Sequence, residues 1–183
     1  MKTIVVTGAN RGIGFEICNE LGALGHEVIV TARNVRKGID ASNKMRDKGY
    51  NTHFYQLDVE EEKSITLFTH ELGKSHHQVD VLINNAAILR DNGMHLRDLD
   101  MKVFDRMMKI NLKGPMLLTR AMLRMLKNSS DPRVINVSSG MGALNTMGGG
   151  NPAYRLSKAA LNALTGIFSA EEPGIKFNAM CPG

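Results

Sequence analysis

Cysteine is scarce in this 183-residue sequence, tryptophan is absent, and no apolar run approaches the length that crosses a membrane. The two cysteines, Cys18 and Cys181, stand far apart and support neither a disulfide framework nor a metal site. The adjacent pair His76-His77 has no converging ligands in the sequence, so we interpret it as part of a solvated turn and expect no metal. These absences argue against secreted disulfide scaffolds, zinc modules and membrane-spanning proteins.

The positive charge of the chain is not concentrated anywhere. The net charge is +5, but lysine and arginine are dispersed and no basic tract stands out, so we expect neither nucleic acid nor membrane as a partner. Hydrophobic residues make up 43% and charged residues 22%, which is typical of one soluble globular domain over 1–183. Met1-Lys2 leads directly into a predicted strand and leaves no room for a signal peptide, which predicts a cytoplasmic protein.

A glycine-rich stretch, residues 7–14, joins a predicted strand over 3–6 to a predicted helix. The strand is β-branched and apolar, as in a parallel sheet covered on both faces, and the helix has one apolar face formed by Ile13, Ile17, Leu21 and Leu24. Glycines let the backbone turn sharply, and free N–H groups at a helix start favour an anion such as a pyrophosphate. A purely structural turn remains the alternative. The candidate phosphate-binding residues are Gly8, Asn10, Arg11, Gly12, Ile13 and Gly14.

The rest of the chain continues to alternate strands and helices. This alternation predicts an α/β fold in three layers, a doubly wound parallel sheet of the Rossmann type. The expected strands are 3–6, 27–31, 53–58, 79–83, 133–139 and 175–180, and the expected helices are 13–24, 39–48, 60–72, 98–126 (disturbed at Gly114-Pro115) and one from about 152. Residues 140–151 lack a period and predict a flexible loop.

The end of the second strand indicates which dinucleotide the fold would bind. An acidic residue there would bind the free 2′-hydroxyl of NAD, but the sequence has Ala32-Arg33. Arg33 together with Arg11 of the glycine stretch would grip a phosphate, although a lone arginine after a strand is often only a surface charge. We therefore expect NADP(H), with NAD the less favoured cofactor.

Tyr154 and Lys158 stand four residues apart in the last predicted helix and so share one face. A nearby ammonium favours the phenolate and would lower the pKa of the phenol toward neutrality. Taken alone, such a pair is common on solvent-facing helices. The strand over 133–139 ends in Ser138-Ser139, where open α/β sheets bind ligands.

Four motifs in this order resemble the short-chain dehydrogenase/reductase family: Thr7-Gly8-x-x-x-Gly12-x-Gly14, Asn84-Asn85-Ala86-Ala87, Ser138-Ser139 and Tyr154-x-x-x-Lys158. The resemblance spans 7–183, and Ala87 replaces the glycine usual in the second motif. It implies Tyr154 as proton donor, Ser139 as the group that polarises a carbonyl, Lys158 as ribose ligand, and Asn111 as anchor of a water. Further cofactor contacts would come from Asp58, Val59, Asn85, Ala86, Pro182 and Gly183. Asp58 could instead cap the following helix.

The implied reaction is hydride transfer between NADP(H) and a small carbonyl or alcohol substrate, as in carbonyl reductases. Residues 140–151 would line an apolar substrate pocket. The alternatives are a nucleotide-binding regulatory protein without turnover and an epimerase or dehydratase on the same fold. Because family members usually continue beyond Pro182-Gly183, we expect the sequence to be truncated at its C-terminus, lacking a substrate-covering segment. The full-length chain would form a homo-oligomer, and the 183-residue chain would bind NADPH poorly.

Overall fold

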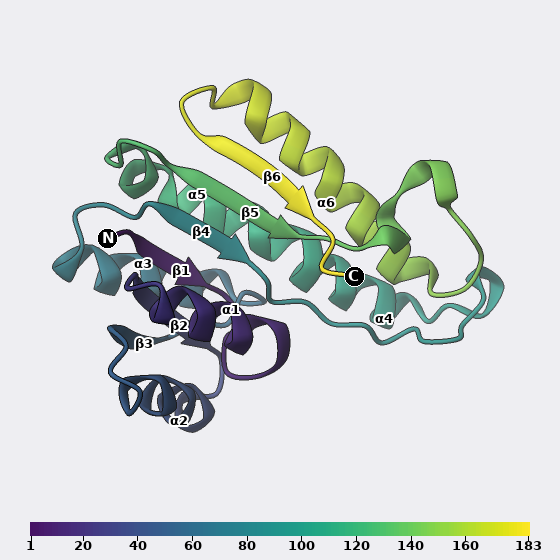
Figure 1. The fold of residues 1–183 in the computed structure, drawn as a ribbon. Helices are drawn as coiled ribbons and strands as arrows, with labels where there is room; N and C mark the ends of the chain where they lie inside the picture. Colours follow the sequence, from purple (N-terminus) through teal and green to yellow (C-terminus); the bar gives the residue numbers. More distant parts are fainter.

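Six parallel strands form a single sheet in the computed structural model, which describes residues 1–183. Their order across the sheet is β3-β2-β1-β4-β5-β6 (Figure 1). The chain starts in the middle and winds outward twice, so the carboxyl ends of β1 and β4 flank the point where the winding reverses. The strands are β1 (Thr3–Val6), β2 (Glu27–Ala32), β3 (Thr52–Gln56), β4 (Val81–Asn84), β5 (Arg133–Val137) and β6 (Lys176–Met180).

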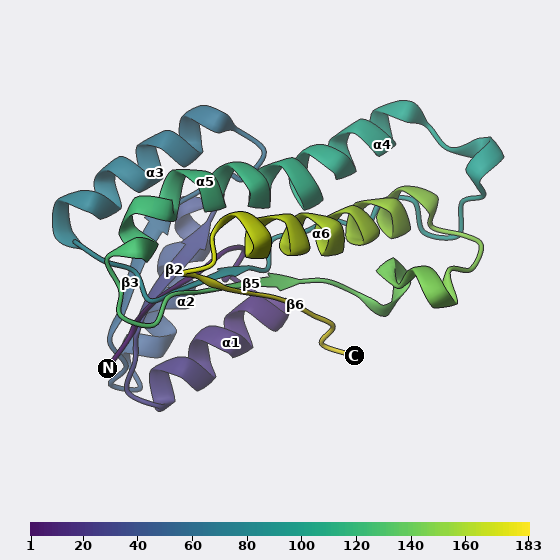
Figure 2. The same cartoon turned by 90° about the horizontal axis from the view of Figure 1, so that it is seen from above.

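Helices cover both faces of this sheet, as the predicted three layers require. Figure 2 shows α1 and α2 on one face and α3, α5 and α6 on the other. The helices are α1 (Gly12–Ala23), α2 (Val35–Arg46), α3 (Glu62–Ser75), α4 (Met101–Met108), α5 (Gly114–Lys127) and α6 (Pro152–Glu171). A π-helical segment, Lys109–Lys113, joins α4 to α5, and short 3-10 turns occupy Leu96–Asp98, Gly140–Gly142 and Leu144–Thr146.

Alternate strand residues form two separate cores, because successive side chains of a strand point to opposite faces. Val5 and its neighbours in the sheet, among them Ile29 and Leu82, pack with α3 and α5. Ile4 and Val6 pack with α1 and α2 on the other face. Burial on both faces explains the unbroken apolar strands seen in the sequence. The last strand, β6, lies at an edge of the sheet.

The buried face of α1 agrees only in part with the prediction: Ile17 and Leu21 pack against the core, but the other two predicted residues do not. Ile13 is 50% exposed and Leu24 is 71% exposed, whereas Gly14, Cys18 and Gly22 are buried. A small residue faces the sheet at these positions because the helix packs very close to its neighbours; a Cβ on Gly22, for example, would meet the Tyr50 ring at 2.9 Å. Apolar periodicity does not detect such a face, since glycine contributes nothing to it.

Two helix predictions also require correction. Helix α2 begins at Val35, four residues before the expected start at 39, because Asn34 caps it by accepting a hydrogen bond from the Lys37 N–H. The expected long helix starts at Met101 and is interrupted by the π-helical segment that contains Asn111. The helix is therefore disturbed before Gly114-Pro115, the position at which the sequence predicted the disturbance.

Smaller differences concern strand and loop ends. The third and fifth strands end at Gln56 and Val137, earlier than expected, and α3 begins at Glu62. The expected irregular loop over 140–151 contains two 3-10 turns. His76 is not part of a solvated turn, since its side chain is 12% exposed and its Nε2 lies 3.3 Å from Glu27 Oε1. No group of side chains is arranged to hold a metal ion, and none of the helices has the length and apolarity of a membrane span.

Candidate active site

The glycine stretch forms a turn between β1 and α1 that only glycine fits. Gly8 and Gly12 adopt φ values of +66° and +57°, which other residues rarely reach. A Cβ on Gly14 would lie 2.7 Å from the Gly8 carbonyl oxygen and would overlap the Asn85 amide. Helix α1 starts here with no side-chain cap and no acidic residue in its first turn. The turn is therefore a cradle with a positive helix end, which suits a phosphate group.

The segment that follows β4 is hydrogen-bonded to this cradle. Asn85 Nδ2 donates to the Thr7 carbonyl oxygen at 2.8 Å, and the N–H groups of Asn85 and Ala86 donate to Thr7 Oγ1 at 3.0 and 2.9 Å. The neighbouring Asn84 instead joins β4 to β5, through a 2.8 Å bond from its Nδ2 to Asn136 Oδ1. The two asparagines thus tie adjacent strand ends together.

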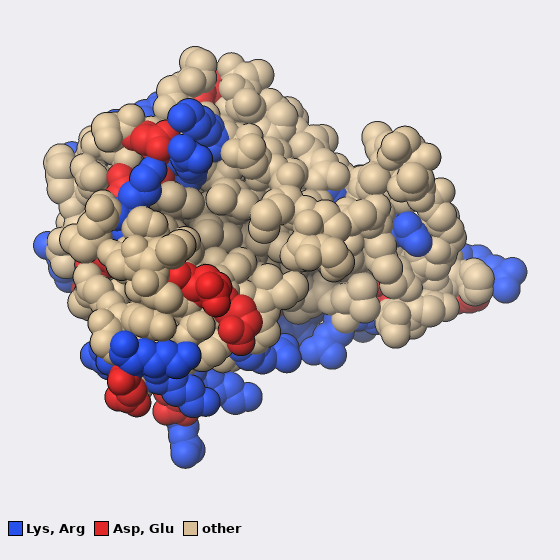
Figure 3. All heavy atoms as spheres, viewed as in Figure 1, with Lys and Arg blue, Asp and Glu red and all other residues tan.

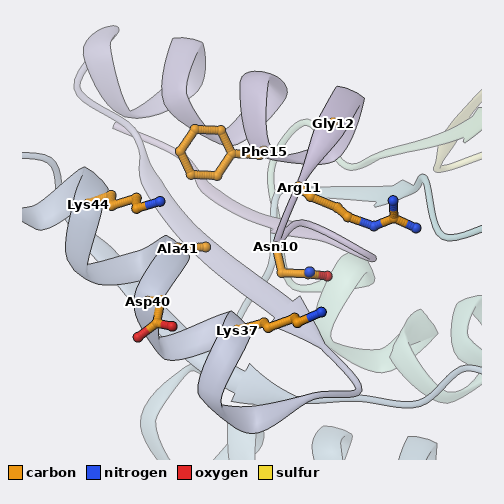
Figure 4. Close-up of a pocket in the computed structure, with 8 residues that line it drawn as sticks. All are labelled: Asn10, Arg11, Gly12, Phe15, Lys37, Asp40, Ala41 and Lys44. Carbon is orange, nitrogen blue, oxygen red and sulfur yellow. The ribbon is translucent and has the colours of Figure 1, made fainter.

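A hollow of about 430 Å³ opens beside the cradle, between α1 and α2. Figure 4 shows Arg11 and Lys37 extending on either side of Asn10, while the Asp40 carboxylate points away from them. The residues that line the hollow are Asn10, Arg11, Gly12, Phe15, Lys37, Asp40, Ala41 and Lys44. Neither Arg11 nor Lys37 forms an ion pair, so their charge is available to an anion.

Lys37 was missed by sequence reasoning, and Arg33 does not line this hollow. Arg33 follows β2 directly and is exposed, with its carbonyl oxygen accepting from Gln56 Nε2 at 3.2 Å. Lys37 lies in the first turn of α2, and the late start predicted for that helix hid it. Asn34 could have predicted the position of Lys37, because a capping asparagine places the third residue after it in the first helical turn.

Ser139, Tyr154 and Lys158 come together at the carboxyl edge of the sheet. Tyr154 and Lys158 are one turn apart on α6, with Lys158 Nζ 5.6 Å from the centre of the Tyr154 ring. Ser139 follows β5 and lies close enough to Tyr154 to act on the pKa of its phenol. Lys158 is almost fully buried, at 2% exposure, and Nζ donates to the Val137 carbonyl oxygen at 2.7 Å. Tyr154 is therefore not part of a solvent-facing pair.

The pKa of Tyr154 departs from the expectation. Partial burial raises the pKa of its phenol above the ordinary value of 10, the hydrogen bond with Ser139 opposes this, and the nearby Cys181 adds to the rise. Lys158 does not lower it, because its amine is turned to Val137 and because burial lowers the pKa of that amine to about 8. The phenol is consequently protonated at neutral pH and available as an acid.

Asn111 lies in the π-helical segment and is 1% exposed. Its Nδ2 donates to the Ile88 carbonyl oxygen at 2.8 Å and to Ser157 Oγ at 3.1 Å, and its Oδ1 accepts from the Ile88 N–H at 2.8 Å. Both amide donors are thus used within the protein. The side chain joins the chain after β4 to α6, next to Lys158, and retains one oxygen lone pair for a water.

The remaining predicted residues also lie at the carboxyl edge. Asp58 does not cap α3, because the helix begins at Glu62 and Asp58 Oδ1 accepts from the Glu60 N–H at 3.0 Å in a local turn. The buried Val59 packs against Gly114. Pro182 and Gly183 follow β6, whose end is held to β5 by a 2.7 Å bond from the Ser138 N–H to the Met180 carbonyl oxygen. Cys181, which precedes them, accepts from the Gly140 N–H at 3.1 Å, next to Ser139.

Charged side chains avoid much of the face over β5, β6 and the loop after β5. In Figure 3 this region is largely uncharged, while lysine and arginine gather over α2. Three exposed apolar side chains occupy the loop: Met141, Leu144 and Met147. One group of cations thus lies on the side of the phosphate cradle, and the exposed apolar side chains of the loop lie on the side of Tyr154.

The fold and this edge define a dinucleotide-binding oxidoreductase. The family description "short chain dehydrogenase" matches residues 2–183, and the chain belongs to this family. A (+)-neomenthol dehydrogenase of Arabidopsis thaliana is 30% identical over 98% of this chain and 81% of its own length. Salutaridine reductase of Papaver somniferum is 29% identical over 100% and 81%. The solved NADPH-bound carbonyl reductase from chicken fatty liver is 33% identical, with a TM-score of 0.89 over 100% of this chain and 79% of that one. The predicted family and fold are confirmed.

Proposed function

We propose that this chain reduces a carbonyl substrate with NADPH, or oxidises the corresponding alcohol with NADP⁺, at the edge formed by Ser139, Tyr154 and Lys158. The observation that carries the proposal is a protonated phenol that lies beside Ser139 and one helical turn from a buried amine. When bound, the nicotinamide cofactor would supply or accept the hydride.

Each side chain has a defined task in the proposed reduction. Tyr154 donates its phenolic proton to the carbonyl oxygen as the hydride arrives at the carbon. Ser139 donates a hydrogen bond to the same oxygen and stabilises the negative charge that develops there. Lys158, with a pKa near 8, binds the cofactor ribose and returns a proton toward Tyr154. Asn111 holds Ile88 and Ser157 and so fixes the wall behind Lys158.

The choice of NADP(H) rests on the cations around the adenosine end of the cradle. Arg11 and Lys37 line the hollow beside Asn10, Arg33 follows β2, and no carboxylate stands at the end of β2 where NAD would need one. A bidentate guanidinium and an amine are both suited to a 2′-phosphate. The solved structures similar to this chain include complexes with NADP, which supports the same choice. In this proposal Asp58 binds the adenine amino group, and Asn85, Ala86, Pro182 and Gly183 contact the nicotinamide half.

We also propose that the protein works in the cytoplasm as a homo-oligomer. Both thiols are free, which is typical of a reducing compartment. Light scattering on the purified protein and fractionation of the cells that make it would test the two statements.

Replacing Tyr154 by phenylalanine tests the proposed chemistry. Tyr154→Phe should lower the rate of NADPH oxidation over a panel of aldehydes and ketones by about 10²–10⁴-fold, with NADPH affinity unchanged. Tyr55→Phe is the matched control, because Tyr55 also loses a hydroxyl bonded to a serine, Ser75, but lies in β3 away from the site. Equal turnover in the two variants would refute the role of Tyr154. Substrate conversion without net NADPH oxidation would instead indicate an epimerase or dehydratase.

A further inference from the structure

Helix α6 carries Tyr154 in its first turn but has no local cap. The residue before it, Asn151, adopts a left-handed conformation, with φ of 52°, and its side chain does not cap the helix. Asn151 Oδ1 instead accepts from the Gly93 N–H at 2.9 Å. The first N–H groups of a helix have no partner within it, and a buried one needs an acceptor from elsewhere.

Asp91, from the loop between β4 and α4, supplies that acceptor. Its Oδ2 receives the N–H groups of Ala153 at 2.7 Å and Tyr154 at 3.2 Å, across more than 60 residues of sequence. Asp91 is completely buried, at 0% exposure. A carboxyl group at a helix N-terminus also interacts favourably with the helix dipole. The backbone of Tyr154 is therefore fixed by a side chain from a distant loop.

The carbonyl group of Tyr154 is held from the same side. Ser157 Oγ donates to it at 2.8 Å and accepts from Asn111 Nδ2, which also binds Ile88, three residues before Asp91. The N–H and the carbonyl group of Tyr154 are thus both connected to the segment after β4. These hydrogen bonds hold the start of α6 and this segment in a fixed position relative to each other.

The second carboxyl oxygen of Asp91 shows that this arrangement does not serve stability alone. Oδ1 is buried and has no hydrogen-bond partner in the protein. A buried polar atom without a partner lowers stability. The position keeps a carboxyl group that reaches the N–H of Tyr154 itself.

From these contacts we propose that Asp91 is a positioning residue for Tyr154: it fixes the first turn of α6 so that the phenol meets the carbonyl oxygen of the substrate. This inference rests on the proposed function. Displacement of a reacting group by about 1 Å can cost on the order of 10²-fold in rate. Loss of the Asp91 contact should therefore act on kcat far more than on cofactor binding.

The experiment compares Asp91→Ala and Asp91→Asn with Asp100→Ala as the matched control. Asp100 caps α4 in the same way, with Oδ1 accepting from the Lys102 N–H at 2.8 Å, but it lies on the surface. Asp91→Ala should lower kcat about 10–100-fold and change the NADPH Kd less than about threefold. Asp91→Asn keeps an amide oxygen at the same place and should retain kcat within about threefold, and Asp100→Ala should retain it as well.

Wild-type kcat in Asp91→Ala, or no rescue in Asp91→Asn, would overturn the inference. If Asp91→Ala does not fold, Asp91→Ser takes its place, because its hydroxyl is too short to reach both N–H groups, and wild-type kcat there would overturn the inference equally. Tyr154→Phe is measured in parallel. Full activity in that variant means that the proposed function has failed, whereas an inactive Tyr154→Phe beside a fully active Asp91→Ala means that only the role of Asp91 has failed.

Discussion

Removing the buried ammonium of Lys158 should change how stability depends on pH. Burial lowers its pKa from the ordinary 10.5 to about 8, at 2% exposure of the residue. At 1.36 kcal/mol per pKa unit, holding the charged form inside the folded protein costs about 3 kcal/mol at neutral pH. Lys158→Met keeps the apolar stem and removes the charge, but leaves the Val137 carbonyl without its donor, at a cost of about 1 kcal/mol. The variant should therefore be more stable than the wild type by about 1–2 kcal/mol at pH 7.

The sign of the pH dependence follows from the lowered pKa. Between about pH 8 and 10.5 the unfolded chain binds more protons at Lys158 than the folded chain, so the stability contributed by this group rises with pH across that window. Urea unfolding followed by circular dichroism, without cofactor, would measure both proteins from pH 7 to 9.5. The advantage of Lys158→Met should shrink by about 2 kcal/mol over that range. A constant difference, or one that grows with pH, would refute the buried-ammonium reasoning.

Two further predictions concern the cofactor cradle. Arg33→Ala and Lys37→Gln should each weaken NADPH binding about 10- to 150-fold, as the loss of a charge-assisted hydrogen bond does, while NADH binding stays nearly unchanged. Fluorescence titration would measure this, with Lys44→Gln, at the far end of the hollow, as the control; equal losses for NADH would contradict the 2′-phosphate assignment. Gly14→Ala should lower stability by about 1–3 kcal/mol and abolish NADPH binding, since its Cβ overlaps the turn, and an unchanged urea midpoint would contradict that packing.

The order of elements and the cradle could be predicted because they depend on strong local signals. An unbroken β-branched run, a glycine turn and an amphipathic helix repeat in a pattern that only a parallel sheet with helices on both faces satisfies. The place of Ser138-Ser139 at a strand end followed from the rule that all carboxyl ends meet at one edge, whereas Asn85 and the choice of Ser139 came from the family resemblance. The structure places them there.

What the sequence did not predict depends on long-range contacts. The cap of α6 comes from Asp91, about 60 residues earlier, and no local sequence motif predicts this contact. The pKa of Tyr154 depends on burial and on where Lys158 directs its amine, neither of which spacing along a helix reveals. The tight glycine face of α1 was missed because apolar periodicity counts side chains that glycine lacks.

Transfer of deuterium tests the central claim most directly. NADPH labelled with deuterium at C4 of the nicotinamide, in each stereoisomer separately, would be incubated with the protein and a carbonyl substrate found active in the panel, and the alcohol analysed by mass spectrometry. We predict one deuterium on the carbinol carbon from one stereoisomer and none from the other, with product formation lost in Tyr154→Phe and retained in Tyr55→Phe. Alcohol without deuterium from either isomer, or labelled alcohol formed at the wild-type rate by Tyr154→Phe, would contradict hydride transfer with Tyr154 as the proton donor.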